Sequence, residues 1–255
     1  MIDSMNDRFY AWYINATNPY RLLFGKRKGG FIWVKKSGRF WLVSHEGIRL
    51  YSPSAHCLGA SVGVFEQRFE PVLKVERGDT VMDVGASIGD TSVIFARKCA
   101  PGKVIAVEPE PLNCECLELN LAGFPHKVIQ RAAWGRKETL KFHINPSVMG
   151  HSIAGLPDDI GSIEVQADTI DSMAEGTHID FLKIDVQGAE LEALKGAKDL
   201  LKTGIKVVVE THYLEEEMRS TLPEVVCFLK DQGLNVKTTP QIKGCFAPDI
   251  VHAWR

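Results

Sequence analysis

Two short stretches of the chain end in side chains that could move a proton. Asp185 follows the apolar run 179–184, and His212 follows the apolar run 206–210, with Glu210 two residues before it. Each run is typical of a buried strand, so these side chains are expected at strand ends. A histidine near its reference pKa of about 6.5 can accept a proton from a hydroxyl group. We predict that His212, or failing it Asp185, is the general base of a reaction on a hydroxyl oxygen.

Charged residues around Asp185 each have two interpretations. Lys183 shares a strand face with Asp185, where it either takes part in catalysis or pairs with a carboxylate. Glu190 begins the next predicted helix, where a carboxylate is also favourable for the helix dipole. Asp168 and Asp171 precede the strand that leads to Asp185, and we expect them to cap a helix.

The second feature that could do chemistry is a strand, turn and helix over 81–92. A β-branched run ends in Asp83, a turn with glycines at 85 and 89 follows, and apolar residues then recur at helical spacing from Val93. Gly85 lets the backbone approach a bound ligand without a Cβ in the way, and the helix offers free backbone N–H groups at its start. We therefore predict that this turn binds a nucleotide-like ligand.

The residues of this turn distinguish between three kinds of ligand. A phosphate-binding P-loop needs a lysine after its last glycine, and none follows Gly89. A dinucleotide-binding turn needs a central glycine, where this chain has Ser87. Asp83 would repel a pyrophosphate but attract the cationic sulfonium and amino groups of S-adenosylmethionine. The sequence therefore favours S-adenosylmethionine as the cofactor.

Glu108 adds support for an adenosine-containing ligand. It follows the apolar run 104–107, about 20 residues after the turn, where a carboxylate can accept hydrogen bonds from both ribose hydroxyls. Because NAD enzymes use the same arrangement, Glu108 does not choose between NAD and S-adenosylmethionine.

Strands and helices alternate from Gly78 onward. Beyond the strand that ends in Asp83, we expect strands at 104–107, 127–130, 179–184, 206–210, 234–238 and 250–254, and helices at 111–121, 189–201 and 215–231. A β excursion at 139–144 and 163–165 surrounds a polar loop over 145–159. Repeated βα units predict an α/β fold, a parallel sheet with helices on both faces.

The first 77 residues have a different character. Aromatic residues crowd a helical segment over 9–20, short strands are expected at 31–34, 40–43 and 48–51, and a helix at 62–73. We predict an N-terminal helix and β-meander extension over 1–77 and a cofactor-binding domain over 78–255. Up to residue 39 this extension carries eight Lys and Arg residues against Asp3 and Asp7. Such a segment either contacts phosphates, anionic lipid or sugars, or is a solvated face over a small aromatic core.

Composition sets limits on the class of protein. The 255 residues carry a net charge of −2, so bulk charge favours neither nucleic acid nor membrane as a partner. The six cysteines lack CxxC spacing, which indicates free thiols in a reducing compartment. We find neither a signal-peptide pattern nor an apolar run near the roughly 20 residues of a membrane helix, and expect a cytoplasmic protein.

A set of short motifs occurs in order over roughly 71–213. It comprises Asp83–Thr91, Ala106–Pro109, Asn120, Ala132–Gly135, Thr169–Asp171, Ile179–Glu190, Leu194, Gly196 and Glu210–His212. Together these motifs resemble the FkbM family of S-adenosylmethionine-dependent methyltransferases. The resemblance implies a class I methyltransferase fold, a Rossmann-like and mostly parallel seven-stranded sheet. It also implies O-methylation of hydroxyls on sugars, glycolipids or secondary metabolites.

From the residues and this resemblance we predict two sets of functional side chains. The predicted catalytic residues are His212, Asp185 and Lys183. The predicted cofactor-binding residues are Asp83, Gly85, Ala86, Ser87, Gly89, Thr91, Glu108, Pro109, Ala132 and Asp185.

Two positions depart from the family pattern. Ser87 stands where the family more often has Asn, and Gln187 stands where it usually has Glu. Asp185, Glu210 and His212 offer hard ligands, but Gln187 removes a charge near them, and the chain lacks a spaced Asp pair. We predict no metal ligand.

The acceptor is the least determined part of this interpretation. We expect a small molecule or glycan, with the loop 145–159, including His151 and Ser152, either lining its pocket or merely forming surface. A nucleic-acid methyltransferase is an alternative, but Asp185–Gly188 is not the D/N-P-P-Y/F motif of amino-methylating enzymes, so we expect no nucleic acid. A non-catalytic nucleotide-binding protein with this fold is the other alternative. Peripheral membrane contact through the basic N-terminal segment is compatible with the sequence, which does not determine an oligomeric state.

Overall fold

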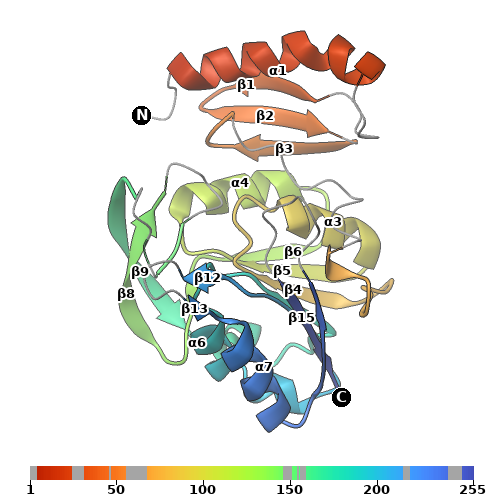
Figure 1. Cartoon of the computed structure of the whole chain (residues 1–255), viewed down its shortest axis with the longest axis vertical. Helices are drawn as coiled ribbons and strands as arrows, with labels where there is room; N and C mark the ends of the chain where they lie inside the picture. The colour runs from red at the N-terminus through yellow and green to blue at the C-terminus, as the bar shows by residue number, and fades with distance from the viewer. Residues whose placement is uncertain are drawn as a thin grey trace.

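Seven strands form the central sheet of the computed structural model, in the order β14-β15-β11-β10-β4-β5-β6 (Figure 1). The structure describes residues 5–24, 32–45, 47–55, 68–145, 151–153, 155, 159–214, 219–240 and 249–255. The strands are β4 (Thr80–Val84), β5 (Lys103–Val107), β6 (His126–Ile129), β10 (Phe181–Ile184), β11 (Lys206–Glu210), β14 (Asn235–Thr239) and β15 (Ile250–Trp254). β15 runs antiparallel to both of its neighbours, and the other pairs are parallel. The predicted mostly parallel sheet is confirmed.

Helices cover both faces of this sheet because successive side chains of each strand point to opposite sides. Val81 packs with α3 (Asp90–Cys99) and α4 (Pro111–Leu121) on one face. Met82 packs with α5 (Ile170–Ala174), α6 (Glu190–Lys195) and α7 (Leu222–Asp231) on the other. Because these strands are parallel, their carboxyl ends lie together at one edge of the sheet. This is the edge where open α/β sheets bind their ligands.

A smaller sheet projects beside the central one. It has the order β7-β9-β8, from β7 (Ala132–Ala133), β8 (Glu138–Ile144) and β9 (Gly161–Asp168), and encloses its own apolar cluster around Phe142 and Val165. The predicted β excursion is therefore present. Of the expected loop 145–159, residues 146–150, 154 and 156–158 lie outside the described residues.

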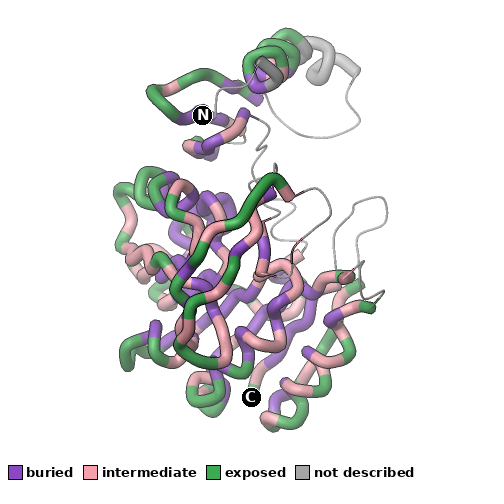
Figure 2. Tube along the Cα trace, turned by 90° about the vertical axis from the view of Figure 1, so that its left-hand side faces the viewer, coloured by how far each residue is buried: buried purple, intermediate pink, exposed green. Residues whose placement is uncertain are grey.

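The N-terminal segment is a helix on a three-stranded antiparallel meander. α1 (Met5–Phe24) packs on β1 (Trp33–Ser37) and β2 (Phe40–His45), and β3 (Ile48–Ser52) completes the meander on the side of the central domain. Figure 2 shows this segment at one end of the molecule. An asparagine amide satisfies the backbone of each outer strand. Asn15 bonds both the N–H and the C=O of Val34 on β1, and Asn120 of α4 does the same for Tyr51 on β3. The predicted extension is thus joined to the central domain, and the boundary at residue 77 stays a prediction.

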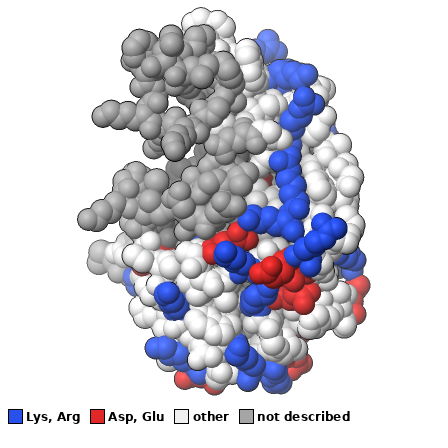
Figure 3. Space-filling view, turned by 90° about the vertical axis from the view of Figure 1, so that its right-hand side faces the viewer, with Lys and Arg blue, Asp and Glu red and all other residues white. Residues whose placement is uncertain are grey.

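Charge is unevenly distributed over the surface. Figure 3 shows Lys and Arg side chains in a band that runs down one side of the molecule from its N-terminal end, with acidic side chains gathered lower. Among the described residues from 5 to 55, Asp7 is the only carboxylate side chain, and it is buried.

Three helix predictions were wrong in extent. The helix expected at 189–201 is α6, which ends at its C-cap Gly196, followed by a separate 3-10 turn, η1 (Leu200–Lys202). The backbone at Gly196 lies so close to the Trp134 carbonyl that a Cβ would overlap it, so this position requires glycine. The helix expected from residue 215 begins at Leu222, after strands β12 (Tyr213–Leu214) and β13 (Arg219–Ser220). Of the helix expected at 62–73, residues 62–67 lie outside the described residues, Arg68 and Phe69 are helical, and 70–73 are not.

The helix cap in the structure differs from the caps expected at Asp168 and Asp171. Thr169 caps α5 by accepting a hydrogen bond from the Ser172 N–H. Asp171 instead accepts from the backbone N–H groups of Asp199 and Leu200 at the start of η1. A carboxylate two residues into one helix therefore satisfies the free donors of the next element.

Two expectations about cysteines and membrane segments can be compared with the described residues. Cys99, Cys114, Cys116 and Cys227 are free thiols there, and Cys57 and Cys245 lie outside them. Within the same residues, none of the helices combines the length and the apolar character needed to cross a bilayer.

Candidate active site

The turn after β4 is held against the end of β10. Gly85 has a φ of 76°, and a Cβ at this position would overlap the carbonyl oxygen of Asp185. Gly89 has a φ of 88°, and a Cβ there would meet Leu117 of α4. Sequence reasoning explained Gly85 by space for a ligand. The structure gives a different reason, since this glycine brings the two strand ends into contact.

Asp83 and Lys183 face each other across β4 and β10. They are paired in the sheet register, and Lys183 Nζ lies 3.0 Å from Asp83 Oδ1. Ser92 Oγ donates to Asp83 Oδ2 at 2.6 Å, and Lys183 Nζ also donates to the Gly85 carbonyl at 3.2 Å. Burial alone would lower the pKa of Lys183, but Asp83, Asp185 and Glu210 outweigh it and raise the pKa. Lys183 is therefore a buried permanent cation that ties the turn to β10.

Asp185 follows β10 and is surrounded by donors. Lys183 Nζ lies 3.5 Å from Oδ2, and Gln187 Nε2 donates to Oδ1 at 3.0 Å. Burial would raise the pKa of Asp185, but Lys183, His212 and Arg68 together lower it. Asp185 is therefore an ionised carboxylate, and Gln187 contributes a donor that a glutamate could not supply.

Glu210 ends β11 and is an acid with a shifted pKa. Burial, with Asp185 as a second cause, raises the pKa of Glu210 to about 7, against the opposing effects of Arg68, His212 and Lys183. Arg68 Nη2 lies 2.6 Å from Oε1, while Oε2 is buried without a hydrogen-bond partner among the described residues. Sequence reasoning missed Arg68, because it comes from a segment before the motif and shows no spacing that relates it to β11.

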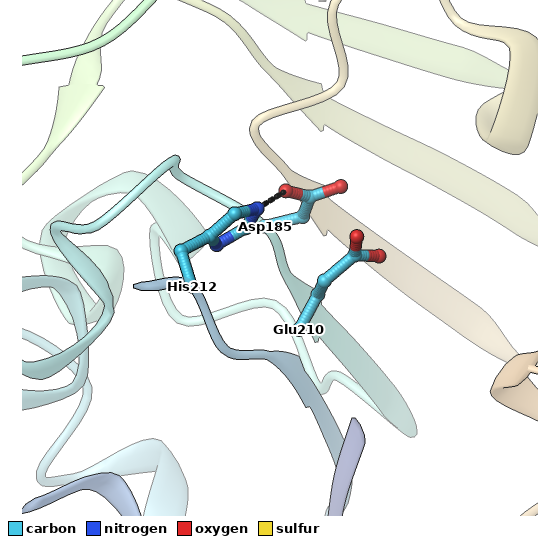
Figure 4. Close-up of side chains that lie close together, drawn as sticks. All are labelled: Asp185, Glu210 and His212. Carbon is cyan, nitrogen blue, oxygen red and sulfur yellow. Dashed lines mark ion pairs between the residues drawn. The ribbon is translucent and has the colours of Figure 1, made fainter. Parts of the chain in front are cut away.

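His212 contacts two carboxylates, those of Glu190 and Asp185. Figure 4 shows the contact of His212 with Asp185, with Glu210 beside them. The His212 Nδ1–H donates to Glu190 Oε1 at 2.9 Å, and Nε2 lies 3.7 Å from Asp185 Oδ1. Burial lowers the pKa of His212, but the Glu190 hydrogen bond and the charges of Asp185, Glu190 and Glu210 outweigh it and raise the pKa to about 9. The expectation of a histidine near its reference pKa is therefore wrong for the protein without ligands.

Local hydrogen bonds fix both members of the His212–Glu190 pair. The His212 N–H donates to Thr221 Oγ1, and its carbonyl accepts from the Thr221 N–H. Glu190 is fully buried, and its Oε1 also accepts from the Gly188 N–H at 2.8 Å. Sequence reasoning placed Glu190 at a helix start but could not relate it to a histidine 22 residues away.

Glu108 lies at the carboxyl end of β5, beside the turn. Its carboxylate accepts from the Ser87 N–H at 3.0 Å and the Glu110 N–H at 2.9 Å. Burial raises its pKa to about 7, although those two backbone donors oppose the shift. Pro109 follows it and lines a cavity of about 400 Å³ together with Pro111, Gln130, Arg131 and residues 163–166.

The predicted site residues fall into two groups along one sheet edge. Asp185, Lys183 and His212 lie together at the ends of β10 and β11. The other predicted residues lie at or just beyond the ends of β4, β5 and β6. They are Asp83, Gly85, Ala86, Ser87, Gly89, Thr91, Glu108, Pro109 and Ala132. His151 belongs to neither group by its described contacts, since it accepts from the Asn145 N–H and lies edge-on to Phe142.

Asp185, Glu210 and His212 each offer a ligand atom within 4.8 Å of the others, which is the spacing of a candidate metal site. Lys183 and Arg68 already lie against these two carboxylates, which therefore would have to give up these ion pairs to ligate a metal ion directly. We therefore keep the prediction of no metal ligand and include no metal in the reaction.

The sheet order and the polar groups at this edge define a class I methyltransferase fold, as predicted. The chain belongs to the FkbM methyltransferase family, because the family described as "Methyltransferase FkbM domain" matches residues 83–235, more than half of the chain. The protein is therefore a methyltransferase. The matched region begins at Asp83 and includes the cluster around His212.

Two curated relatives are similar over part of the chain. Methyltransferase sdnD of Sordaria araneosa is 26% identical in an alignment of 214 residues that covers 68% of this chain and 80% of that protein. Hexuronic acid methyltransferase AglP of Haloferax volcanii is 28% identical over 142 residues, which are 54% of this chain and 58% of that protein.

Two solved structures share the fold. A crystal structure of methyltransferase FkbM from Methylobacillus flagellatus has a TM-score of 0.54 at 18% identity, covering 74% of this chain and 48% of that chain. Aeropyrum pernix fibrillarin with natively bound S-adenosyl-L-methionine has a TM-score of 0.52 at 14% identity, covering 86% of this chain and 97% of that chain.

Proposed function

We propose that the protein is an S-adenosylmethionine-dependent O-methyltransferase that acts on a hydroxyl group of a sugar, glycolipid or secondary metabolite. The observation that carries this proposal is the pairing of His212 with buried Glu190 next to Asp185, at the ligand-binding edge of the sheet. Methylation of a hydroxyl needs a group that accepts its proton, and this pair places a histidine where it can do so.

The charges at this edge suit a cationic cofactor. Four carboxylates (Asp83, Asp185, Glu190 and Glu210) pair with three cationic groups (Lys183, Arg68 and His212), and a fifth carboxylate, Glu108, lies beside the turn. Glu190 Oε2 and Glu210 Oε2 are also buried without hydrogen-bond partners among the described residues. When bound, S-adenosylmethionine supplies a methyl group on a sulfonium centre. The predicted residues that would hold it by contact are Gly85, Ala86, Ser87, Gly89, Thr91, Glu108, Pro109, Ala132 and Asp185.

Asp83 and Lys183 have separate roles in this proposal. Asp83 is fully buried between Ser92 and Lys183, so it acts on the cofactor through its charge rather than by contact. Lys183 holds Asp83, Asp185 and the Gly85 carbonyl in place, and its raised pKa makes it unsuitable as a base. It is a positioning residue in this proposal.

His212 is the proposed general base, with Asp185 orienting its other side. With a pKa of about 9, little of it is neutral at physiological pH in the free protein. A cationic cofactor nearby would lower this pKa by like-charge repulsion. Cofactor binding therefore favours the neutral form of His212, which is the form that can accept the proton.

The acceptor class rests on similarity. The relative from Haloferax volcanii is named for hexuronic acid, and this supports a sugar acceptor for the present chain. The basic side chain of Arg68 beside Glu210 would also suit an acceptor that carries a carboxylate near its hydroxyl.

The test is methyl transfer from methyl-labelled S-adenosylmethionine to uronic acid glycosides and to fractions of a cell extract. The labelled product is treated with mild alkali, which removes a methyl ester but leaves a methyl ether. An alkali-stable label that is lost in His212→Asn and kept in Glu192→Gln, a change in the same region outside the cluster, supports the proposal.

Three results would each contradict part of the proposed function. An alkali-labile label would mean that the acceptor is a carboxylate, for which a base is unnecessary. Label recovered in RNA would favour the nucleic-acid alternative. Binding of S-adenosylmethionine without transfer to any fraction would favour a non-catalytic protein with this fold.

A further inference from the structure

Polar atoms at the ligand-binding edge of the sheet are buried without a hydrogen bond among the described residues. The acceptor atoms are Glu190 Oε2 and Glu210 Oε2, and the donor atoms are Nε and Nη2 of Arg68. Buried polar groups are nearly always hydrogen-bonded, so unmet groups at such an edge indicate what a ligand supplies there. Donors and acceptors are both unmet, which indicates a ligand that carries hydroxyl groups together with an acceptor for the guanidinium.

Arg68 keeps one edge of its guanidinium available. Nη2 lies 2.6 Å from Glu210 Oε1 as an ion pair, yet neither Nη2 nor Nε makes a hydrogen bond within the described part of the chain. Nε and Nη2 form the side of the planar group that can bind both oxygens of one carboxylate. Glu210 contacts only one of these two nitrogens, so it does not fill the bidentate position.

The other two cations of the site are already used by the protein. Lys183 Nζ contacts two carboxylates and the Gly85 carbonyl, and its side chain is buried. His212 also contacts two carboxylates. An anionic group on a ligand therefore finds its donors at Arg68.

The sheet order places Arg68 on the side of the acceptor. Glu210 ends β11, and the order β11-β10-β4 separates it by two strands from the turn that is predicted to bind the cofactor. Neighbouring strands lie roughly 4.8 Å apart, so about 10 Å separate these two strand ends. In contrast, ligand atoms of Glu210 and His212 lie within 4.8 Å of each other. The position of Arg68 suits a carboxylate on the acceptor better than the carboxylate of S-adenosylmethionine.

Glu210 is able to release Arg68 when such an acceptor enters. Burial, with Asp185 as the second cause, raises the pKa of Glu210 to about 7. Glu210 can therefore take a proton from solvent as the acceptor carboxylate replaces it at Arg68, and it then carries no charge that repels the acceptor. Figure 4 shows the Glu210 carboxylate beside that of Asp185. A phosphate, with up to two charges, would be repelled more strongly by Asp185.

We propose that Arg68 is the specificity-determining residue of the acceptor site and binds the carboxylate of a uronic acid through Nε and Nη2. Glu190 and Glu210 form hydrogen bonds with the hydroxyl groups of the same sugar. This inference rests on the proposed function, because it names the acceptor of that reaction. The carboxylate is held by Arg68, and the methyl group goes to a hydroxyl near His212.

The test compares the methyl glycosides of glucuronic and galacturonic acid with those of glucose and galactose, which lack the carboxylate. Affinity for the full chain with bound S-adenosylhomocysteine is measured by calorimetric titration. We expect at least one uronide to bind about tenfold or more tightly than its neutral partner, because a charge-assisted bidentate contact is worth at least that much. Arg68→Gln should remove this preference. Arg68→Lys should restore only part of it, because an ammonium group cannot make the two parallel bonds.

Lys98→Gln is the matched control. Lys98 pairs with Glu70 at the far end of α3, and the side chains of Glu70 and Glu210 are both 7% exposed. This variant also leaves a buried carboxylate without its cation, but it should keep the wild-type preference. Glu210→Gln removes the internal partner of Arg68 and should therefore tighten uronide binding. If Arg68→Gln does not fold, as judged by thermal unfolding, Arg68→Lys carries the test.

The inference is overturned if neither uronide binds more tightly than its neutral partner, or if the Arg68 variants weaken both members of a pair equally. Weaker uronide binding in Glu210→Gln would also overturn it, since the ion pair would then be structural. If Arg68→Gln weakens the binding of S-adenosylhomocysteine itself, Arg68 contacts the carboxylate of the cofactor instead. An alkali-stable label on a neutral acceptor would remove this inference and leave the proposed O-methylation in place.

Discussion

Glu190 Oε1 accepts a hydrogen bond from His212 Nδ1 at 2.9 Å, and it does so from a fully buried position. This contact joins the start of α6 to the end of β11. Asp185 and Glu210 are the other carboxylates that act on His212, and Lys183 and Arg68 lie against those two carboxylates. The carboxylates together outweigh the cost of burying the imidazolium and favour a proton on His212.

The first prediction concerns the pH dependence of methyl transfer. If neutral His212 accepts the proton, kcat/KM rises with pH and levels off near the His212 pKa of about 9. Glu190→Gln removes a negative charge from Nδ1, so the apparent pKa should fall toward the reference value of about 6.5. The measurement is a pH profile of kcat/KM for the wild type and the variant.

Two further variants separate this role from a structural one. Glu192→Gln lies in the same helix and pairs with Lys195, so its pH profile should match that of the wild type. His212→Asn should lose both activity and its rise with pH. An unshifted profile in Glu190→Gln would rule out Glu190 as the positioning residue and leave His212 as the base. A wild-type rate in His212→Asn would rule out the base itself.

The second prediction concerns stability against pH. The pKa of His212 is raised from 6.5 to about 9, so its contribution is fully present below pH 6.5 and is lost as pH rises through about 9. The pKa of Glu210 is raised from 4.5 to about 7, so its ionisation above pH 4.5 also disfavours the folded state. Both pKa shifts make the folded state less stable as pH rises. The free energy of unfolding should therefore decrease from pH 6.5 to 9.

Urea unfolding at a series of pH values measures this effect. His212→Asn should be less stable overall, because it leaves Glu190 without its partner, but its stability should change less between pH 6.5 and 9. The readout is the difference between wild type and variant in the slope of unfolding free energy against pH. The contribution of His212 to the unfolding free energy over this interval is of order 1–3 kcal/mol. Stability that rises over this interval in the wild type would contradict the shifts.

The elements of the central sheet could be predicted because their signals are local. The run 206–210 predicts β11 with its exact bounds, since alternate faces of a parallel strand are both buried and apolar. The pattern before Gly85 and after Gly89 predicts a strand, a turn and a helix for the same reason. These features depend on residues that are neighbours in the sequence.

The parts that could not be predicted depend on residues far apart. The need for glycine at the end of α6 comes from the Trp134 carbonyl, which lies against Gly196 but belongs to another segment. The pKa of His212 depends on carboxylates from β10, α6 and β11, so a single run of residues cannot reveal it. Arg68 reaches Glu210 across 142 positions of the chain, and the sequence carries no spacing that relates the two.

The third prediction concerns backbone strain at Ser87. Its φ of 49° lies in the left-handed region, which Asn tolerates better than Ser. The contact to Glu108 is made by the Ser87 N–H and would survive a change of side chain. Ser87→Asn should therefore raise the free energy of unfolding by about 0.5 kcal/mol, and Ser87→Val should lower it by at least about 1 kcal/mol.

Urea unfolding again supplies the measurement, with Ser172→Asn as the matched control. Ser172 lies inside α5, where the backbone is helical and Asn brings no conformational advantage. Equal effects of Asn at positions 87 and 172 would show that the left-handed backbone at Ser87 is not a source of strain.

The last prediction concerns the link between the N-terminal meander and the cofactor turn. Asn120 bonds the N–H and C=O of Tyr51 on β3, and its Nδ2 also donates to the Ile88 carbonyl at 2.7 Å. Asn120→Ala leaves these buried backbone groups without their partner, so it should cost about 2 kcal/mol of stability and loosen the turn. Affinity for S-adenosylmethionine should fall, as measured by calorimetric titration.

Asn15→Ala is the control for this effect. Asn15 makes the same pair of bonds to the edge strand β1, but its described contacts do not reach the turn. It should destabilise the N-terminal segment and leave cofactor affinity unchanged. Hydrogen exchange at Ile88 and its neighbours should accelerate in Asn120→Ala alone. If both variants weaken cofactor binding equally, the effect comes from loss of the meander as a whole, and the direct bond from Asn120 to Ile88 does not set the affinity of the turn.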